Sequence, residues 1–94
     1  MKISASEQVA AWLVALSPDA KKRVRAALRG LAAGRGDVIP LRGDLSGYSR
    51  LRVGGLRVVY SRQPGRVIRL EYADTRDVVY EKFLQILKRS LRHR

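Results

Sequence analysis

The spacing of apolar residues changes twice along this chain, and that change constrains the fold more than any other feature of the sequence. Between residues 9 and 31, apolar residues recur every three or four positions around an interruption at Ser17-Pro18, which predicts a hairpin of two amphipathic helices. Between residues 50 and 72, apolar and polar residues alternate, which predicts β-strands. Helical spacing returns from residue 79 to residue 91. This order predicts one α+β domain over residues 1–94.

The β-region is expected to form a small antiparallel meander, with the helical hairpin packed on one face and a last helix after Thr75. Its strands should be residues 50–53, 56–60 and 67–72, separated by turns at Gly54-Gly55 and Gln63-Pro64-Gly65. Lys2-Ile3-Ser4 can add a short edge strand. The segment after Asp37 is expected to be loop because it carries Pro40, Gly43 and Gly47.

Alternation along the strands assigns each side chain to one of two sheet faces. Apolar side chains, including Leu51, Val58 and Tyr72, should face the helices. The opposite face should then collect four arginines and one acid, namely Arg50, Arg52, Arg57, Arg69 and Glu71. Such a face could bind phosphate or could simply be hydrated, since an antiparallel sheet often turns one side to water. Binding is favoured because neutral protein surfaces intersperse both signs of charge.

Positive charge narrows the choice of partners. The chain has 20 Lys plus Arg, 15 of them Arg, against 8 Asp plus Glu, so its net charge is +12 at pH 7. This balance indicates a polyanionic partner, and the guanidinium group fits phosphate with paired hydrogen bonds, although a GC-rich genome would also raise the arginine content. Cysteine is absent and His93 is the one histidine, which argues against thiolate or histidine-rich metal sites.

The chain also lacks the sequence features of a membrane or secreted protein. No apolar run approaches the roughly 18 residues that cross a bilayer. The first residues do not form the apolar core of a signal peptide. These features predict a cytoplasmic protein with no membrane partner, and nothing in the sequence calls for a cofactor.

The aromatic residues divide into core and site candidates. Trp12 and Phe83 fall on the apolar stripes of predicted helices, and Tyr72 on a predicted strand, so all three are expected in the core. Tyr60 fits either core packing or hydrogen bonding at an edge. Tyr48, just before the first strand, and Tyr80, at the start of the last helix, could reach a binding site.

One stretch of the chain resembles a known family. Residues 41–60 contain a Leu-x-Gly loop, then Arg50-Leu51-Arg52-Val53-Gly54, then Arg57-Val58-Val59-Tyr60, and residues 76–80 read Arg-x-x-x-Tyr. This string is similar to the central signature of the RelE/ParE toxin superfamily, closer to RelE. The resemblance extends over essentially the whole chain and implies the toxin of a type II toxin–antitoxin system, a ribosome-dependent mRNA endoribonuclease.

The resemblance also implies roles for individual residues. Arg57, Arg76 and Tyr80 match the catalytic positions of the cleaving members, and Arg50 and Arg52 match basic positions on the sheet. With Arg69 from the same expected face and Tyr48 nearby, these residues form the predicted RNA- and phosphate-binding set. The chain departs from many relatives in having Asp74-Thr75-Arg76 where they have Gly-His-Arg, which removes one possible acid–base group.

Cleavage by the 2′-hydroxyl of RNA needs a base, positive charge near the phosphorane and an acid. Arg57 and Arg76 can supply the charge, and the ribosome would align the mRNA. Tyrosine titrates near 10, so Tyr80 would act as a base only beside concentrated positive charge. Glu71 is an alternative base unless it pairs with Arg69, and His93 is a candidate acid unless it belongs to a frayed terminus.

The implied partners are a cognate antitoxin, the ribosome with its mRNA and, through the toxin–antitoxin complex, operator DNA. The antitoxin is expected to present an acidic amphipathic segment to the helical hairpin and the basic groove. The last helix is expected to shift on binding, because its cationic tail has little apolar anchorage past Leu91. Two other functions stay open: a ParE-like toxin that inhibits DNA gyrase without cleaving RNA, and an inactive basic module that binds nucleic acid.

Overall fold

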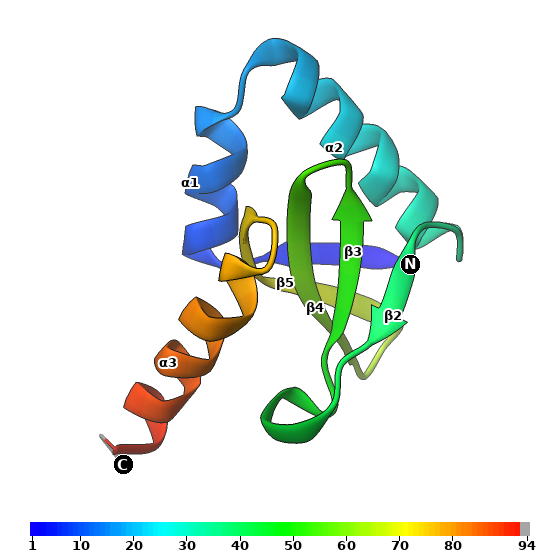
Figure 1. Ribbon diagram of the computed structural model, residues 1–94. Helices are drawn as coiled ribbons and strands as arrows, with labels where there is room; N and C mark the ends of the chain where they lie inside the picture. Colours follow the sequence, from blue (N-terminus) through cyan, green and yellow to red (C-terminus); the bar gives the residue numbers. More distant parts are fainter. Residues whose placement is uncertain (93–94) are drawn as a thin grey trace.

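The computed structural model describes residues 1–92 and contains an α+β domain (Figure 1). Its described part holds three α-helices, a short 3₁₀ turn and five strands. In chain order these are β1 (Lys2–Ala5), α1 (Glu7–Ala15), α2 (Pro18–Ala32), β2 (Val38–Pro40), the 3₁₀ turn η1 (Gly43–Leu45), β3 (Ser49–Val53), β4 (Leu56–Gln63), β5 (Val67–Thr75) and α3 (Val78–Arg92). The predicted fold class is therefore confirmed. None of the helices within residues 1–92 is long and apolar enough to cross a bilayer.

Local capping defines the α1–α2 hairpin. The Ser6 hydroxyl accepts a hydrogen bond from the Val9 backbone N–H at 3.2 Å, and the Ser17 hydroxyl accepts one from Ala20 at 3.3 Å. Pro18 occupies the first turn of α2, where its missing N–H leaves no hydrogen bond unmade. Gly34, with a φ of +82°, takes the left-handed conformation that ends the helix.

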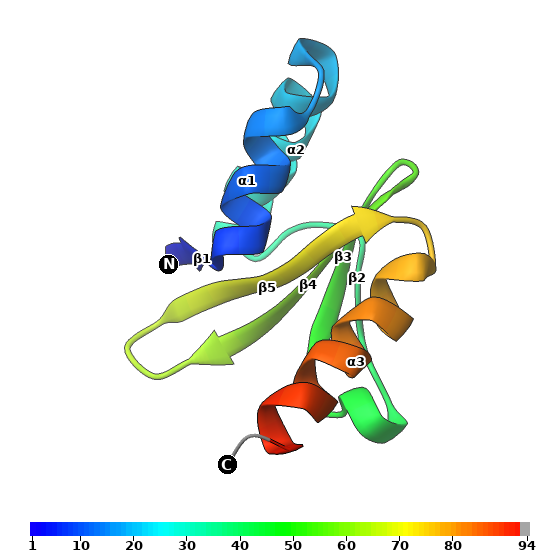
Figure 2. The same cartoon turned by 90° about the vertical axis from the view of Figure 1, so that its left-hand side faces the viewer.

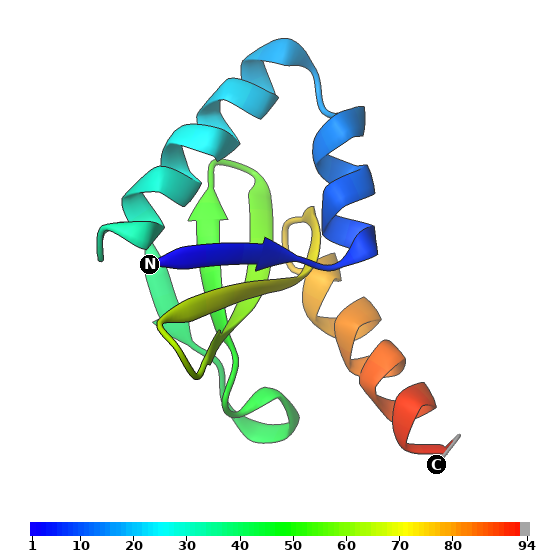
Figure 3. The same cartoon turned by 180° about the vertical axis from the view of Figure 1, so that it is seen from behind.

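The sheet has the strand order β1-β5-β4-β3-β2. The central strands form the predicted antiparallel meander, and the expected edge strand at the N-terminus pairs with β5 in parallel (Figure 3). The expectation of loop after Asp37 was wrong for residues 38–40, because β2 pairs there with β3. A proline is tolerated in β2 because an edge strand has one side without hydrogen-bonding partners.

The main core lies between the hairpin and one face of the sheet. Its buried members are Val9, Leu31, Leu51, Val58, Tyr60, Ile68, Leu70 and Ala73, and Trp12 packs against them. Tyr60 is 1% exposed, which assigns it to the core. The apolar stripes of α1 and α2 therefore bury the helices against the sheet face that the alternation predicted.

A second apolar cluster lies on the opposite face, where α3 crosses the sheet. Figure 2 shows the sheet between the α1–α2 hairpin and α3. Val59, Val79 and Phe83 are buried in this cluster together with Leu45 of the 3₁₀ turn. The central part of this face is therefore covered by α3, which needs an apolar surface for its own stripe, although the sequence placed only the helical hairpin against the sheet.

Tyr72 belongs to this second cluster and not to the main core, which corrects its sequence assignment. In the register of β4 and β5, Val59 pairs with Tyr72 but Tyr60 pairs with Leu70, so Glu71 has no partner across the strands. This β-bulge interrupts the alternation of β5. Tyr72 consequently stacks on Phe83, with 6.2 Å between the ring centroids, and Glu71 accepts a hydrogen bond from the Ser61 hydroxyl of β4.

Candidate nucleic-acid interface

Three arginines of β3 and β4 face α3 near the β3–β4 turn. Arg52 lies directly opposite Arg57 across the two strands, and Arg50 lies opposite Val59 on the same face. The backbone of Arg76, in the turn between β5 and α3, is held at the same end of the sheet, because its N–H donates to the Gly55 carbonyl at 2.8 Å. We refer to Arg50, Arg52, Arg57 and Arg76 as the arginine cluster.

Asp37, in the turn before β2, pairs with two members of the cluster. Its carboxylate accepts from Arg52 Nε at 2.6 Å and from Arg50 Nη2 at 3.5 Å, and its backbone carbonyl accepts from the Arg52 N–H at 2.9 Å. Sequence reasoning missed Asp37 because it lies 13 and 15 residues from its partners in a segment read as loop. One carboxylate therefore neutralises part of a surface that carries four guanidinium groups.

Two guanidinium groups of the cluster are held near the sheet with donors left over. Arg50 is 9% exposed, and Arg57 folds back so that its Nη1 donates to the carbonyls of Gly54 at 2.7 Å and Leu56 at 3.0 Å. The Nε atoms of Arg50 and Arg57 are buried without an acceptor among the described residues. Unmatched buried donors cost free energy, so these side chains gain from any anion toward which they can turn.

The turn that carries Arg76 is conformationally unusual. Arg76 has a φ of +45°, in the left-handed region that non-glycine residues seldom occupy. Its side chain is exposed. The bond from its N–H to Gly55 ties the turn to the β3–β4 hairpin and sets where α3 begins two residues later.

Tyr80 lies in the first turns of α3 and lines a hollow of about 540 Å³ with Arg50. The other lining residues are Ile39, Leu41, Arg42, Leu45 and Asp77. This hollow brings a tyrosine, two arginines and one carboxylate to a partly apolar surface. Arg50 and Tyr80, both predicted site residues, therefore converge.

Arg69 and Glu71 lie away from the arginine cluster. Arg69 is opposite Ser61, four residues along β4 from Arg57, which corresponds to about 13 Å at 3.3 Å per residue. Glu71 accepts from Arg69 Nε at 3.3 Å and from the Ser61 hydroxyl at 2.6 Å. The structure thus keeps Arg69 on the predicted face but pairs it with an acid, as the alternative reading of Glu71 anticipated.

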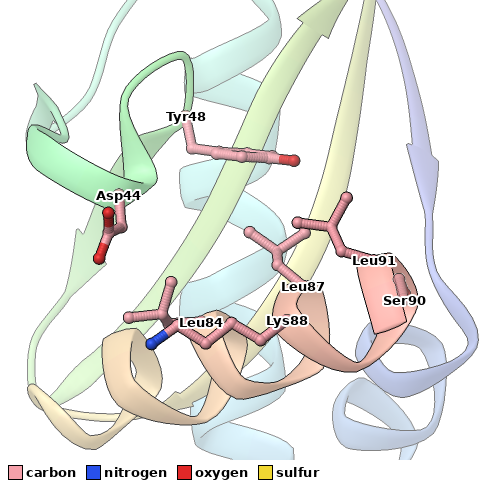
Figure 4. A pocket seen from close by; sticks show the side chains of 7 residues that line it. All are labelled: Asp44, Tyr48, Leu84, Leu87, Lys88, Ser90 and Leu91. Atoms are coloured by element: carbon pink, nitrogen blue, oxygen red, sulfur yellow. The ribbon is translucent and has the colours of Figure 1, made fainter. Parts of the chain in front are cut away.

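Tyr48 lines a cleft between η1 and the second half of α3 (Figure 4). The cleft measures about 440 Å³ and is lined by Asp44, Tyr48, Leu84, Leu87, Lys88, Ser90 and Leu91. The ring of Tyr48 meets Phe83 edge-on at a centroid distance of 5.0 Å. Burial raises the pKa of Tyr48, and the negative charge of Glu71 raises it further. Tyr48 therefore stays protonated at neutral pH and is suited to packing and hydrogen bonding.

Asp74 and Lys82 connect the end of β5 to α3. Lys82 Nζ donates to Asp74 Oδ2 at 2.9 Å, and the Thr75 N–H donates to Oδ1 at 2.7 Å. Burial alone would raise the pKa of Asp74, but these bonds outweigh it and the pKa is lowered. The bond to Asp74 raises the pKa of Lys82. His93, the candidate acid, lies outside the described residues.

Comparison with known proteins places the fold among toxins of toxin–antitoxin systems. No family model matches the sequence, and no curated protein matches it. Solved structures do match. The archaeal RelE–RelB complex from Pyrococcus horikoshii OT3 contains a chain that is 26% identical, with a TM-score of 0.66, over 81% of this chain and 94% of that chain.

Two further complexes share the fold at lower identity. The toxin–antitoxin complex RelBE2 from Mycobacterium tuberculosis matches with a TM-score of 0.67 and 22% identity, over 80% of this chain and 90% of that chain. The YoeB–YefM complex from Staphylococcus aureus matches with a TM-score of 0.64 and 19% identity, over 79% and 94%. The fold is consistent with the RelE/ParE-type toxin superfamily, as the sequence resemblance implied.

Proposed function

We propose that this chain, which has the fold of the RelE-type toxins, is the toxin of a type II toxin–antitoxin pair and cleaves mRNA on the ribosome. The observation that carries the proposal is the arginine cluster beside Tyr80. Arg52 and Arg57 lie opposite each other on β3 and β4, and the backbone of Arg76 is bonded to Gly55 in the turn that joins these two strands. This arrangement suits the binding of consecutive phosphates of a single RNA strand.

The chemistry assigned to the site is mainly electrostatic. Arginine remains protonated, so Arg57 and Arg76 would stabilise the phosphorane and not exchange its protons. Tyr80 would contact the reacting ribose from the hollow it shares with Arg50. A site with few acid–base groups depends on alignment of the 2′-hydroxyl with the phosphate, and this alignment is the part that we assign to the ribosome.

A cognate antitoxin is the second part of the proposal. The matching RelE and YoeB chains come from complexes with RelB and YefM. The free chain carries +12 charges, and the described ion pairs involve only three of its eight acids, Asp37, Glu71 and Asp74. An acidic protein partner would neutralise this surface and stabilise the folded chain by binding it.

Primer extension on translated mRNA after induction of the chain tests the activity. We expect cuts at fixed positions within codons, and a loss of at least about 100-fold in cutting when Arg57→Ala is combined with Arg76→Ala. The matched control is Arg62→Ala with Arg66→Ala, which removes two exposed guanidinium groups at and beside the β4–β5 turn. The assignment of Arg57 and Arg76 to the active site is contradicted if their double variant still cleaves mRNA. It is also contradicted if the control double variant loses as much cleavage.

A supercoiling assay with purified chain and DNA gyrase separates this proposal from the ParE-like alternative. We expect no inhibition of gyrase at concentrations that cleave mRNA. If the chain inhibits gyrase and leaves mRNA uncut, the ParE-like function replaces the proposed one. If it neither inhibits gyrase nor cleaves mRNA, the chain is an inactive basic module.

A further inference from the structure

A polar hollow lies beside the second half of β4, away from the arginine cluster. It measures about 310 Å³, and its lining includes Ser46, Tyr48, Ser61, Arg62, Gln63 and Glu71. Ser61 is four residues along β4 from Arg57, or about 13 Å, so the hollow is separate from the cluster. Tyr48 also lines the cleft that Figure 4 shows. We call this polar site the Glu71 hollow.

The carboxylate of Glu71 keeps half of its capacity to accept hydrogen bonds. Its side chain is 17% exposed. Among the described residues, Oε1 accepts from Arg69 Nε at 3.3 Å and Oε2 accepts from the Ser61 hydroxyl at 2.6 Å. A carboxylate offers about four acceptor sites, so each oxygen of Glu71 retains one. The hollow is therefore lined by two free acceptor sites that lie side by side.

Neighbouring bonds fix the direction of this carboxylate. Gln63 Nε2 donates to the Ser61 hydroxyl oxygen at 2.8 Å, and the Ser61 hydroxyl in turn donates to Glu71. Glu71 occupies the β-bulge of β5, and bulges re-aim side chains near binding and active sites. A carboxylate that is already oriented loses little conformational entropy when it binds a ligand.

We propose that the Glu71 hollow binds a guanine base of single-stranded RNA. The Watson–Crick edge of guanine carries two adjacent donors, N1–H and N2–H, next to the O6 acceptor. The two donors match the two free acceptor sites of Glu71. The Tyr48 hydroxyl, which stays protonated at neutral pH, supplies a donor for O6. The proposal rests on the proposed function in that RNA is the ligand, and it adds a base preference to the contacts with phosphate.

The same carboxylate disfavours the other three bases. Adenine and cytosine each present a ring-nitrogen acceptor beside the amino group, which would set a lone pair against one oxygen of Glu71. Uracil offers one donor between two carbonyl acceptors. A negative charge on an RNA-binding surface also repels phosphate, so Glu71 is suited to selecting a base and not to raising affinity in general.

One RNA strand can reach both the Glu71 hollow and the proposed active site. Leu45 lines the hollow that contains Tyr80, and the next residue, Ser46, lines the Glu71 hollow. The guanine would therefore lie a few nucleotides from the phosphate at the arginine cluster. Arg62 borders the Glu71 hollow, but its Nη1 donates to Met1 Sδ at 3.9 Å, and the proposal gives it no part in binding the base.

Binding of short RNA to the full chain tests the base preference. The probes are labelled uridine oligonucleotides of about eight residues that differ only in one central guanosine, adenosine or cytidine. Their 2′-O-methyl groups block cleavage, and equal numbers of phosphates make the base the only difference. We expect the guanosine probe to bind at least about 5-fold more tightly than the other two in fluorescence anisotropy. It should also shift the amide NMR signals of Ser61 and Glu71.

Glu71→Gln should reverse the preference without changing the size of the side chain. Glutamine pairs one acceptor with one donor, which is the pattern that adenine complements, so the adenosine probe should become the tighter ligand. The matched control, Glu7→Gln, removes the same charge from an exposed residue in the first turn of α1 and should keep the parental preference for guanosine. Thermal unfolding establishes that both variants are folded.

Three results overturn the proposal. The first is equal binding of the three probes by the parent chain, and the second is a preference for guanosine that survives in Glu71→Gln. The third needs no variant: amide shifts on adding the guanosine probe that leave Ser61 and Glu71 unmoved.

These readouts are separate from RNA cleavage. A chain that cleaves mRNA but does not distinguish the probes refutes the base preference and leaves the proposed activity in place. A chain that prefers the guanosine probe through Glu71 but leaves translated mRNA intact refutes the activity and leaves the Glu71 hollow in place. Where both hold, the bases at a fixed offset from the cuts should change from guanine to adenine in Glu71→Gln.

Discussion

Asp37 forms ion pairs with two of the arginines that the proposed function needs for binding phosphate. Its carboxylate bonds to Arg52 at 2.6 Å and to Arg50 at 3.5 Å, so an RNA phosphate has to compete with it. Asp37→Asn should therefore tighten binding of a short single-stranded RNA several-fold. It should also steepen the dependence of log affinity on log salt by up to about 0.7, the value for one additional phosphate contact on a single strand.

Glu7→Gln provides the matched change for this measurement. It adds the same unit of charge but lies in the first turn of α1, on the hairpin side of the sheet. If both variants raise the affinity equally, net charge explains the effect and Asp37 has no specific part in it. Filter binding at several salt concentrations distinguishes the two results.

A substitution of Arg50 distinguishes a structural role of this residue from a functional one. It is 9% exposed, its Nε has no acceptor among the described residues, and its one ion pair measures 3.5 Å. A buried charge with incomplete pairing contributes little to stability, so Arg50→Met should leave the free energy of unfolding unchanged or raise it by up to about 1 kcal/mol. The same variant should cut RNA at least about 10-fold more slowly.

Urea denaturation and cleavage assays on one preparation of Arg50→Met check both expectations. A fall in stability of about 2 kcal/mol or more, with cleavage reduced only in proportion to the unfolded fraction, would make Arg50 a structural residue. Its place in the hollow with Tyr80 would then be incidental.

At the scale of elements, most of the fold could be predicted because local signals agree with the final packing. The helical stripes, the interruption at Ser17-Pro18 and the turn at Gly54-Gly55 each predicted the observed element. The β-bulge at Glu71 could not be read from alternation, since a bulge breaks the pattern on which the reading depends. Val38 and Ile39 favour a strand, but their run ends at Pro40 and is too short to predict one, so β2 depends on its pairing with β3.

The helix α3 should be an integral part of the fold and not an appendage. Phe83 is 4% exposed and contacts Tyr48 and Tyr72 across the second apolar cluster. Phe83→Ala should lower the free energy of unfolding by about 3 kcal/mol. Ile86→Ala, on the same helix but 41% exposed, should cost less than about 1 kcal/mol. Similar small losses in both variants, measured by chemical denaturation, would mean that α3 is only loosely attached to the sheet.

The Asp74–Lys82 pair should stabilise the junction of β5 and α3 in a pH-dependent way. The lowered pKa of Asp74 means that its contribution is present above the unfolded pKa of about 3.9 and is lost as pH falls through the folded value. The raised pKa of Lys82 means that its contribution is present below about 10.5 and is lost as pH rises further. Asp74→Asn should thus lower the unfolding midpoint by a few degrees between about pH 5 and pH 10.

Thermal unfolding across pH gives the test of this pair. At a pH below the folded pKa of Asp74, the Asp74→Asn variant and the parent chain should unfold at similar temperatures. Asp77→Asn removes a nearby exposed acid that has no ion pair among the described residues, and its midpoint should follow the parent at every pH. A difference between Asp74→Asn and the parent that persists unchanged in acid would show that the pair is not its source.

At the scale of the whole molecule, the basic residues separate into two surfaces on opposite sides of the sheet. The arginine cluster belongs to the sheet face that α3 covers, whereas Lys21, Arg25 and Arg29 belong to α2, which lies on the other side of the sheet (Figure 2). The sequence could predict that Arg50, Arg52 and Arg57 share a face, because strand alternation determines it. It could not predict that Asp37 forms ion pairs with Arg50 and Arg52, or that residues of α2 and β1 line one hollow. Both features depend on how segments that are distant in the sequence pack together.

This charge distribution predicts that salt stabilises the free chain. A net charge of +12 on 94 residues repels itself in the compact state, and ions screen that repulsion over about 10 Å at 0.1 M. The unfolding midpoint should rise by about 5 °C between about 20 and 300 mM sodium chloride, and by more with sulfate at equal ionic strength if the arginine cluster binds anions. Combining Arg57→Ala with Arg76→Ala should remove the extra effect of sulfate but not the effect of chloride. A midpoint that falls with added chloride would mean that the ion pairs of Asp37, Glu71 and Asp74 outweigh the repulsion, and the free chain would then have no electrostatic need of an acidic partner.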